Sequence, residues 1–268
     1  MPGPRRASWI VGMAIAILIV GWTATGILHL KAVANEMVCQ SALRNIVIAC
    51  HWYHRDNNKF PLATIDPAKC PLLRPEQRLP WTIEILPYLE PRVLKVDVTQ
   101  AWDAEPNQRA GSGFLPWQLI CPAQAQRFDR EHSGVNPFMA LSGIGANAPR
   151  LPIANADAGI WGYERQFTIE AILTRRGLSN TLMLSETSRD LGSWCGGGSA
   201  TLRALIPKQG PYLGYGGQFE GPHPCGGGSA AFCDGSVRRF DHRRISPKVF
   251  EALVRVNGKE PIEWSAVE

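Results

Sequence analysis

The hydrophobic pattern opens with one long apolar segment. Residues 7–30 carry no formal charge and follow Arg5 and Arg6. A bilayer core of about 30 Å is crossed by about 20 helical residues, so this segment is long enough to span a membrane. The two arginines on the short side favour a cytoplasmic N-terminus. We therefore predict that residues 1–30 form a cytoplasmic N-terminus and single-pass anchor in the inner (cytoplasmic) membrane, with residues 31–268 extracytoplasmic.

A cleaved signal peptide is the main alternative to this anchor. The start of the chain is basic, and small residues near Ala24 resemble a cleavage site. Signal peptides usually have an apolar region of about 7–15 residues, whereas the apolar run here is longer. The length therefore favours an anchor that stays in the mature protein.

Helical periodicity continues beyond the apolar segment. Apolar residues in steps of three and four are typical of one helix face, and here they are Leu30, Val33, Met37, Val38, Ala42, Ile46, Ala49 and Tyr53. No glycine or proline occurs in residues 27–60, so we predict one continuous helix that reaches about His54 and ends within residues 56–58. Its outer half is expected to pack on a sheet through Val33, Met37, Ala42, Ile46, Ala49 and Tyr53.

Beyond residue 60 the pattern predicts short elements separated by loops. Residues 61–130 are interrupted by prolines, with an expected strand at 114–122. Residues 131–165 are rich in small and turn-forming residues and are predicted to form an exposed loop. The apolar run 181–186 is typical of a buried strand that ends in polar residues.

The C-terminal part contains a strong hairpin signal. Residues 230–233 and 236–240 are strand-like runs on either side of Asp234 and Gly235. Both central residues of a type I′ turn need positive φ, which Asp tolerates and Gly adopts at no steric cost. We expect this turn to fix the register and to place Phe232 and Val237 on the core face of the sheet.

Composition narrows the class of protein. The 268-residue chain is 45% hydrophobic and 19% charged, which is ordinary for a globular domain. Its 21 prolines and 26 glycines favour a loop-rich α+β body over a helical bundle. The net charge is +5, and Lys and Arg are scattered without a run of five, so no nucleic-acid partner is expected.

Seven cysteines in an extracytoplasmic domain are expected to form disulfides, with at least one unpaired because the count is odd. No C-x-x-C motif occurs, which argues against thioredoxin-like redox chemistry and four-cysteine zinc sites. The sequence CGGGSA occurs twice, beginning at Cys195 and at Cys225. Neither copy has the surroundings of a phosphate-binding loop or of a longer repeat. A disulfide between these two cysteines and a chance similarity of two loops both stay open.

Two groups of residues contain side chains that can bind a metal ion. His223, Cys225, Cys233 and Asp234 are close in sequence, but the turn needs Asp234 and strand alternation directs Cys233 to one face. His223 is expected to position a loop by hydrogen bonding. His51 and His54 have helical spacing without the HExxH motif of a metalloprotease, so they are expected to form a rim at the end of the helix. We therefore expect no metal site.

Catalytic signatures are also missing from the sequence. No G-x-S-x-G motif occurs, and Ser185 next to Glu186 has no identified base. Glu186 is better explained as a strand-end carboxylate that accepts hydrogen bonds. The sequence therefore predicts a protein that is not an enzyme and needs no cofactor.

Several motifs occur in the order found in a known family. They include the N-terminal apolar helix and, after it, Cys39, Leu43 to Ile46, Tyr53, Phe60-Pro61, Pro87-Tyr88, Asp103, Asn107, Cys121-Pro122, Ser179-Asn180-Thr181, Glu186, His223-Pro224 and Phe232 with Asp234-Gly235-Ser236-Val237. Together they resemble the DUF1559 family, pseudopilin-like proteins of planctomycete-type bacteria whose ending is often called an H-X9-DG domain. Two features depart from that pattern. The prepilin-like Gly-Phe-Thr-Leu-Ile-Glu start is missing, and ten residues rather than nine separate His223 from Asp234.

The resemblance implies an architecture more than an activity. We predict a pseudopilin-like α+β fold in which a transmembrane helix continues as an amphipathic helix over residues 31–56, packed on an antiparallel sheet formed within residues 57–268. The structural motif residues are Cys39, Tyr53, Pro61, Asn180, Glu186, His223, Asp234 and Gly235. The expected function is that of a membrane-anchored structural or assembly protein of the cell envelope, linked to type II secretion or type IV pilus-like machinery, with pseudopilin-like or other envelope proteins as partners. The alternative is an anchored binding module for a glycan or peptide, because tryptophans occur in turn-rich segments.

Overall fold

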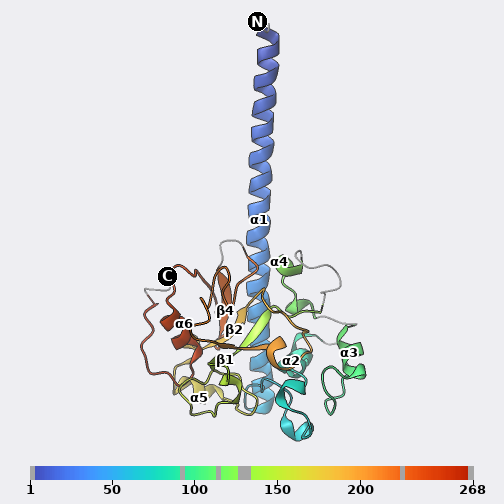
Figure 1. The fold of residues 1–268 in the computed structure, drawn as a ribbon, viewed down its shortest axis with the longest axis vertical. Coiled ribbons are helices and arrows are strands. Elements are labelled where there is room, and N and C mark those ends of the chain that lie inside the picture. The colour runs from blue at the N-terminus through green and yellow to red at the C-terminus, as the bar shows by residue number, and fades with distance from the viewer. Residues whose placement is uncertain (1–3, 91–93, 113–115, 126–133, 224–226, 265–268) are drawn as a thin grey trace.

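The computed structural model of the chain describes residues 4–90, 94–112, 116–125, 134–223 and 227–264. It is an α+β protein built on one long helix, α1, which spans Pro4–Asn57. The N-terminal part of α1 projects from the body as a bare rod, and the C-terminal part lies inside the domain (Figure 1). This helix has the length and apolar composition of a membrane span, features that an N-terminal signal sequence shares.

The predicted packing of α1 is correct in its C-terminal half only. Ala42, Ile46 and Ala49 are buried, and Tyr53 packs at the edge of the same core. Val33 and Met37 are 43% and 64% exposed, so the prediction that they face the sheet is wrong. The periodic stripe runs past the point where the domain begins, because the N-terminal part of α1 is apolar on every side and so continues the pattern without a partner in the domain. Packing against the domain starts at Cys39.

A five-stranded sheet lies against α1. Its strands are β1 (Phe138–Ile144), β2 (Leu182–Glu186), β3 (Leu202–Leu205), β4 (Gly228–Phe232) and β5 (Val237–Phe240), in the order β3-β1-β2-β4-β5. The β1–β2, β2–β4 and β4–β5 pairs are antiparallel, and only β1–β3 is parallel. The remaining α-helices are short: α2 (Trp81–Leu89), α3 (Glu105–Ser112), α4 (Pro122–Ala125), α5 (Ile169–Leu173) and α6 (Pro247–Val254). The predicted α+β class and mostly antiparallel sheet are confirmed.

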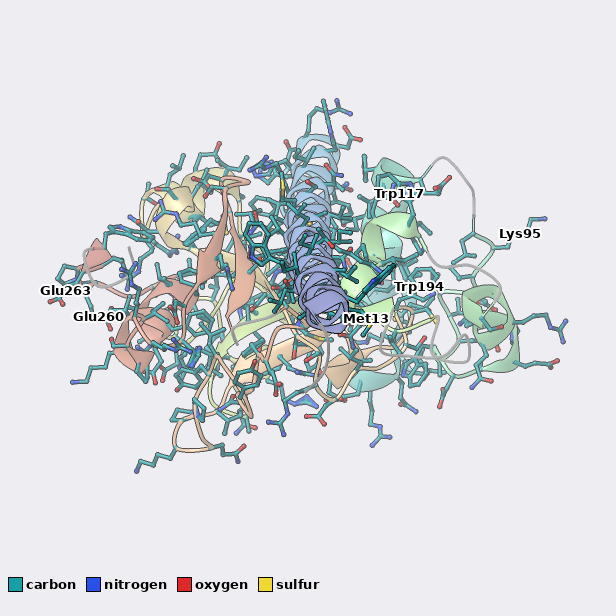
Figure 2. All side chains as sticks on the ribbon, turned by 90° about the horizontal axis from the view of Figure 1, so that it is seen from above. Met13, Lys95, Trp117, Trp194, Glu260 and Glu263 are labelled. Atoms are coloured by element: carbon teal, nitrogen blue, oxygen red, sulfur yellow. A yellow bond between two sulfur atoms is a disulfide. The ribbon has the colours of Figure 1, made fainter. Side chains whose placement is uncertain are left out.

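Both faces of the sheet are covered. On one face, α1 packs with Phe138, Leu184 and Ala231, and on the other face α6 packs with residues that include Leu182 and Phe232. Figure 1 shows α6 on the side of the sheet away from α2 and α3. Viewed along α1, Lys95 and Trp117 lie on one side of the helix and Glu260 and Glu263 on the other (Figure 2). The second apolar layer explains why strands such as β2 are buried at every residue.

The interior strand β1 lies where an exposed loop was predicted, and that prediction is wrong for residues 138–144. Every residue of β1 is buried. The small residues that suggested a loop instead allow close backbone packing. Gly143 has a φ of +122°, and a Cβ atom there would collide with the backbone of residues 157–159. Gly159 donates its N–H to the carbonyl of Ser142 at 2.9 Å.

The strand predicted at residues 114–122 is also wrong where the structure describes it. A 3₁₀ turn occupies Trp117–Leu119, and the short helix α4 begins at Pro122. Pro116 and Pro122 lack the N–H group that a sheet ladder needs, so turns are favoured over a strand there. Residues 114 and 115 lie outside the described residues.

The hairpin predicted around Asp234 and Gly235 is present, with a different turn. Gly235 has a φ of +84°, whereas Asp234 is not among the residues with positive φ. Gly235 donates its N–H to the Phe232 carbonyl at 3.0 Å, and Asp234 Oδ1 accepts the N–H of Ser236 at 2.8 Å. One left-handed glycine after a turn replaces the two left-handed residues of type I′. Val237 packs on the α1 side and Phe232 on the α6 side, so these two residues do not share a face as predicted.

Candidate functional site

A buried disulfide lies where α1 enters the domain. Cys39 on α1 is bonded to Cys121, which immediately precedes α4, with Cα atoms 5.3 Å apart. Cys39 is also the first buried residue along the described side chains of α1. The bond therefore clamps the long helix to the body at the point where the helix emerges from it.

His223 and Glu186 lie beside this disulfide. His223 Nε2 is 3.9 Å from Cys121 Sγ and 3.3 Å from Glu186 Oε2. Both side chains are only 1% exposed. The imidazole and the carboxylate form an ion pair when the imidazole is protonated. The site thus combines two sulfurs, an imidazole and a carboxylate out of contact with bulk water.

The sheet positions Glu186. It is the last residue of β2, and β2 pairs with β4 so that Ser185 faces Ala230. Glu186 Oε1 accepts the backbone N–H of Ser229 at 2.7 Å, as expected of a strand-end carboxylate. Glu186 Oε2 has no hydrogen-bond partner within the described part of the chain. One carboxylate oxygen is therefore fixed by the sheet, and the other is directed at His223.

A close-packed loop carries His223 to the site. A Cβ atom at Gly221 would lie 2.5 Å from the Gly227 carbonyl oxygen and 3.2 Å from Glu186 Oε1, so only glycine fits there. His223 Nδ1 has no hydrogen-bond partner among the described residues, and residues 224–226 of its loop lie outside them, so the expected loop-positioning hydrogen bond stays a prediction. The imidazole contacts Cys121 and Glu186.

The donor atoms at this site have the spacing of a metal centre. Cys39 Sγ, Cys121 Sγ and His223 Nε2 all lie within 4.8 Å of one another. While the two sulfurs are bonded to each other they are not thiolates, and only thiolates bind metals tightly. The oxidised state shown here is therefore a covalent clamp, and a reduced state would offer metal ligands. Burial also slows the attack of external thiols on the disulfide, because exchange needs access to a sulfur, so reduction requires the site to open locally.

Three predicted motif residues meet at the site and five lie elsewhere. Cys39, Glu186 and His223 come together, although no local pattern of residues indicates that they lie side by side. Tyr53 packs edge-on to Tyr88, and Asn180 donates to the Arg176 carbonyl. The other three have structural positions: Pro61 is buried after α1, and Asp234 and Gly235 form the hairpin turn.

The histidines of α1 serve as a rim at the end of the helix, as expected. His51 Nε2 lies 2.7 Å from the Cys233 carbonyl oxygen, and His54 Nε2 accepts the N–H of Ile169 at 3.1 Å. Both imidazoles contact the Phe60 ring. Their ring nitrogens are therefore engaged with the backbone of two distant segments.

The sequence left open a disulfide between Cys195 and Cys225, and the structure shows Cys195 without a disulfide. Cys195 is a buried free thiol 3.1 Å from Ser193 Oγ, and Cys225 lies outside the described residues. Burial raises the pKa of the Cys195 thiol. The observed partner of Cys39 is Cys121, which the sequence marks only through the family resemblance. The two cysteines are 82 residues apart in the chain, so no local sequence pattern predicts that they pair.

The tryptophans give little support to a binding face. Trp81, Trp161 and Trp194 are fully buried, and their indole N–H groups donate to backbone carbonyls. Trp102 is partly buried and donates to the Glu76 carbonyl. Trp117 is 62% exposed. Most tryptophans in the turn-rich segments are thus core residues.

The described chain is an α+β domain joined by a buried disulfide to a long apolar helix. A family model described as a protein of unknown function (DUF1559) matches residues 30–204, more than half of the chain. The chain therefore belongs to the DUF1559 family, as its motifs indicated. Cys39, Cys121 and Glu186 fall inside the matched region, and His223 follows it. No curated protein and no solved structure matches the chain.

Proposed function

We propose that this protein is a membrane-anchored, pseudopilin-like structural or assembly protein of the cell envelope, without catalytic activity. One observation carries the proposal. The same helix, α1, is apolar and bare over its N-terminal half and forms the core of the domain over its C-terminal half. A helix that is hydrophobic all round needs a covering, which lipid or other apolar helices provide.

Charge supports an orientation with the domain outside. Arg5 and Arg6 precede the apolar run, and the first acidic residue of the chain is Glu36. Positive charge on the short N-terminal side is retained in the cytoplasm. Glu36 lies 3.0 Å from Arg239 of β5, so charged contacts with the domain begin just before Cys39. We place residues 8–30 in the bilayer and the domain directly outside it.

The proposed partners are proteins with similar N-terminal helices. Helices in a bilayer associate through packing of their side chains, and the bare part of α1 offers such a surface on every side. The proposal therefore links the protein to type II secretion or type IV pilus-like machinery. Because a glutamate is missing from the apolar run, we assign it an anchored assembly role rather than that of a fibre subunit.

Fractionation combined with site-specific crosslinking tests this function. A photo-crosslinking residue is placed at Leu28, which is exposed on the rod, and in a matched variant at Ile46, which is buried in the domain. We expect the full chain in the membrane fraction with its N-terminus intact, and crosslinks from Leu28 but not Ile46 to proteins with long apolar N-terminal helices. A soluble mature protein beginning near Lys31 would contradict the anchor. A membrane protein whose Leu28 variant yields no such crosslink would contradict the assembly role.

A further inference from the structure

We propose that, in the dithiol form of the protein, Cys39, Cys121, His223 and Glu186 bind one divalent metal ion of the zinc class in a buried tetrahedral site. Disulfide and metal would then be alternative occupants of the same position. The four donor residues come from four separate segments: α1, the residue before α4, the end of β2 and the loop before β4. Two thiolates, an imidazole and a carboxylate are a set that tetrahedral zinc accepts.

The distances between donor atoms suit this geometry. With metal bonds of about 2.3 Å to sulfur and about 2.0–2.1 Å to nitrogen or oxygen, a tetrahedron has edges of about 3.3 Å from N to O and about 3.6 Å from S to N. The observed separations are 3.3 Å between His223 Nε2 and Glu186 Oε2, and 3.9 Å between His223 Nε2 and Cys121 Sγ. After reduction the two sulfurs must move apart to about 3.8 Å, and the Glu186 carboxylate, which lies beside His223 but outside the group of atoms within 4.8 Å of one another, must turn toward the sulfurs.

Unsatisfied polar atoms point to a missing ligand. Glu186 Oε2 is buried, and although His223 Nε2 lies 3.3 Å away, Oε2 accepts no hydrogen bond of good geometry from the described residues, whereas Oε1 of the same carboxylate is held by Ser229. Leaving such an atom unpaired is costly, and buried polar groups in proteins are nearly always satisfied. A cation between Glu186, His223 and the two sulfurs would satisfy Oε2. The disulfide, which carries no charge, does not.

Replacing the disulfide by a bound metal ion requires a reductant, and a dithiol supplies the electrons and protons. The dithiol transfers two electrons and two protons to the Cys39–Cys121 bond, giving two thiols, and is itself oxidised to a disulfide. The metal ion then displaces the two thiol protons and binds both thiolates. Reoxidation by a disulfide reverses the steps and releases the ion. Soft sulfur ligands select zinc-like ions over calcium and magnesium.

Cobalt absorption on the full chain in detergent tests this site. The protein is reduced with dithiothreitol, freed of reductant by anaerobic gel filtration and titrated with Co²⁺. We expect one Co²⁺ per chain, with thiolate-to-cobalt charge-transfer bands and the visible bands of tetrahedral cobalt, both removed by Zn²⁺. The oxidised protein should show neither set of bands.

Variants connect the signal to the four ligands. Cys39→Ser should abolish the charge-transfer bands, whereas Cys195→Ser, which removes a buried free thiol elsewhere, should keep them. Glu186→Gln preserves the acceptor for Ser229 but removes the charge. We expect this substitution to weaken Co²⁺ binding at least about tenfold. Even the loss of a residue that only hydrogen-bonds to a metal ligand lowers metal affinity by about 10–100-fold. His223→Gln should weaken binding similarly.

Circular dichroism shows whether the reduced protein is still folded, which separates loss of the metal site from loss of the fold. If reduction loosens the fold, Zn²⁺ added to the reduced chain should restore the native spectrum, and should not do so for Cys39→Ser. A reduced wild-type protein that is folded but gives no cobalt–thiolate bands overturns the proposal. A reduced protein that stays unfolded in Zn²⁺ also overturns the proposal. A Cys39→Ser variant that keeps the cobalt–thiolate bands overturns it as well.

Discussion

Cys39 and Cys121 are 82 residues apart in the chain, yet their Cα atoms lie 5.3 Å apart and their sulfurs are bonded. The bond fixes α1 to the body at the level where the helix changes from bare rod to domain core. The disulfide therefore matters both for stability and for how rigidly the domain is held on its helix.

Removing the disulfide should destabilise the domain. The Cys39→Ser/Cys121→Ser variant is expected to lose about 2–5 kcal/mol of unfolding free energy, because the unfolded chain regains the freedom of a long loop. Denaturant melts of the oxidised proteins in the presence of a chelator measure this loss. Adding a dithiol reductant should lower the wild-type midpoint and leave the variant unchanged. Equal midpoints for oxidised wild type and variant would show that the clamp does not stabilise the fold.

The point at which α1 begins to pack can be tested with a pair of substitutions. Ile46→Ala should cost about 2–5 kcal/mol because it opens a cavity in the core between α1 and the sheet. Met37→Ala, about two and a half turns earlier, should change stability by less than about 0.5 kcal/mol because Met37 is exposed. Denaturant melts of both variants decide this. A comparable loss for Met37→Ala would mean that packing starts before Cys39.

The hairpin turn depends on one left-handed residue. Gly235→Val should destabilise by about 1–3 kcal/mol, because a β-branched side chain is strained at the observed φ of +84°. Gly235→Asn is the matched control and should lose less, since Asn tolerates this conformation. No heavy atom lies within 4 Å of a Cβ at this position, so steric crowding does not add to the effect. Unchanged midpoints for the valine variant would contradict the strained turn.

The free thiol of Cys233 should be unreactive in the native protein. Burial, together with the nearby Asp234 carboxylate, holds the pKa of Cys233 well above its ordinary value, so the reactive thiolate is scarce. At about pH 8, where an ordinary thiol with a pKa of about 8.5 is partly ionised, iodoacetamide should leave Cys233 unlabelled. Unfolding in denaturant should allow full labelling. Mass spectrometry of the digested protein measures both, and rapid native labelling would show that the β4–β5 turn opens.

Local sequence was enough to predict the long helix, β2 and the hairpin. The apolar run and the glycine-free segment that follows it determine α1, because helix formation depends on neighbouring residues. The run TLMLSE indicates a buried strand by composition, and Asp-Gly indicates a turn by its backbone preferences. Each of these signals lies within a few residues of the feature it predicts, and the family motifs added the expected order of the elements.

Only the tertiary structure decided what those elements pack against. The small residues of β1 are compatible with a loop or with an interior strand, and pairing with β2 and β3 on either side makes this segment a strand, with residues 157–159 packed closely on Gly143. Val237 pairs with Ala231, so it lies on the opposite face from Phe232, and α6 covers the Phe232 face with a second apolar layer. The meeting of Cys39, Cys121, Glu186 and His223 depends on contacts across up to 184 residues of chain, and a single sequence carries no periodicity over such separations. The sequence by itself determined the helix, the turn and the family, and long-range packing determined the site.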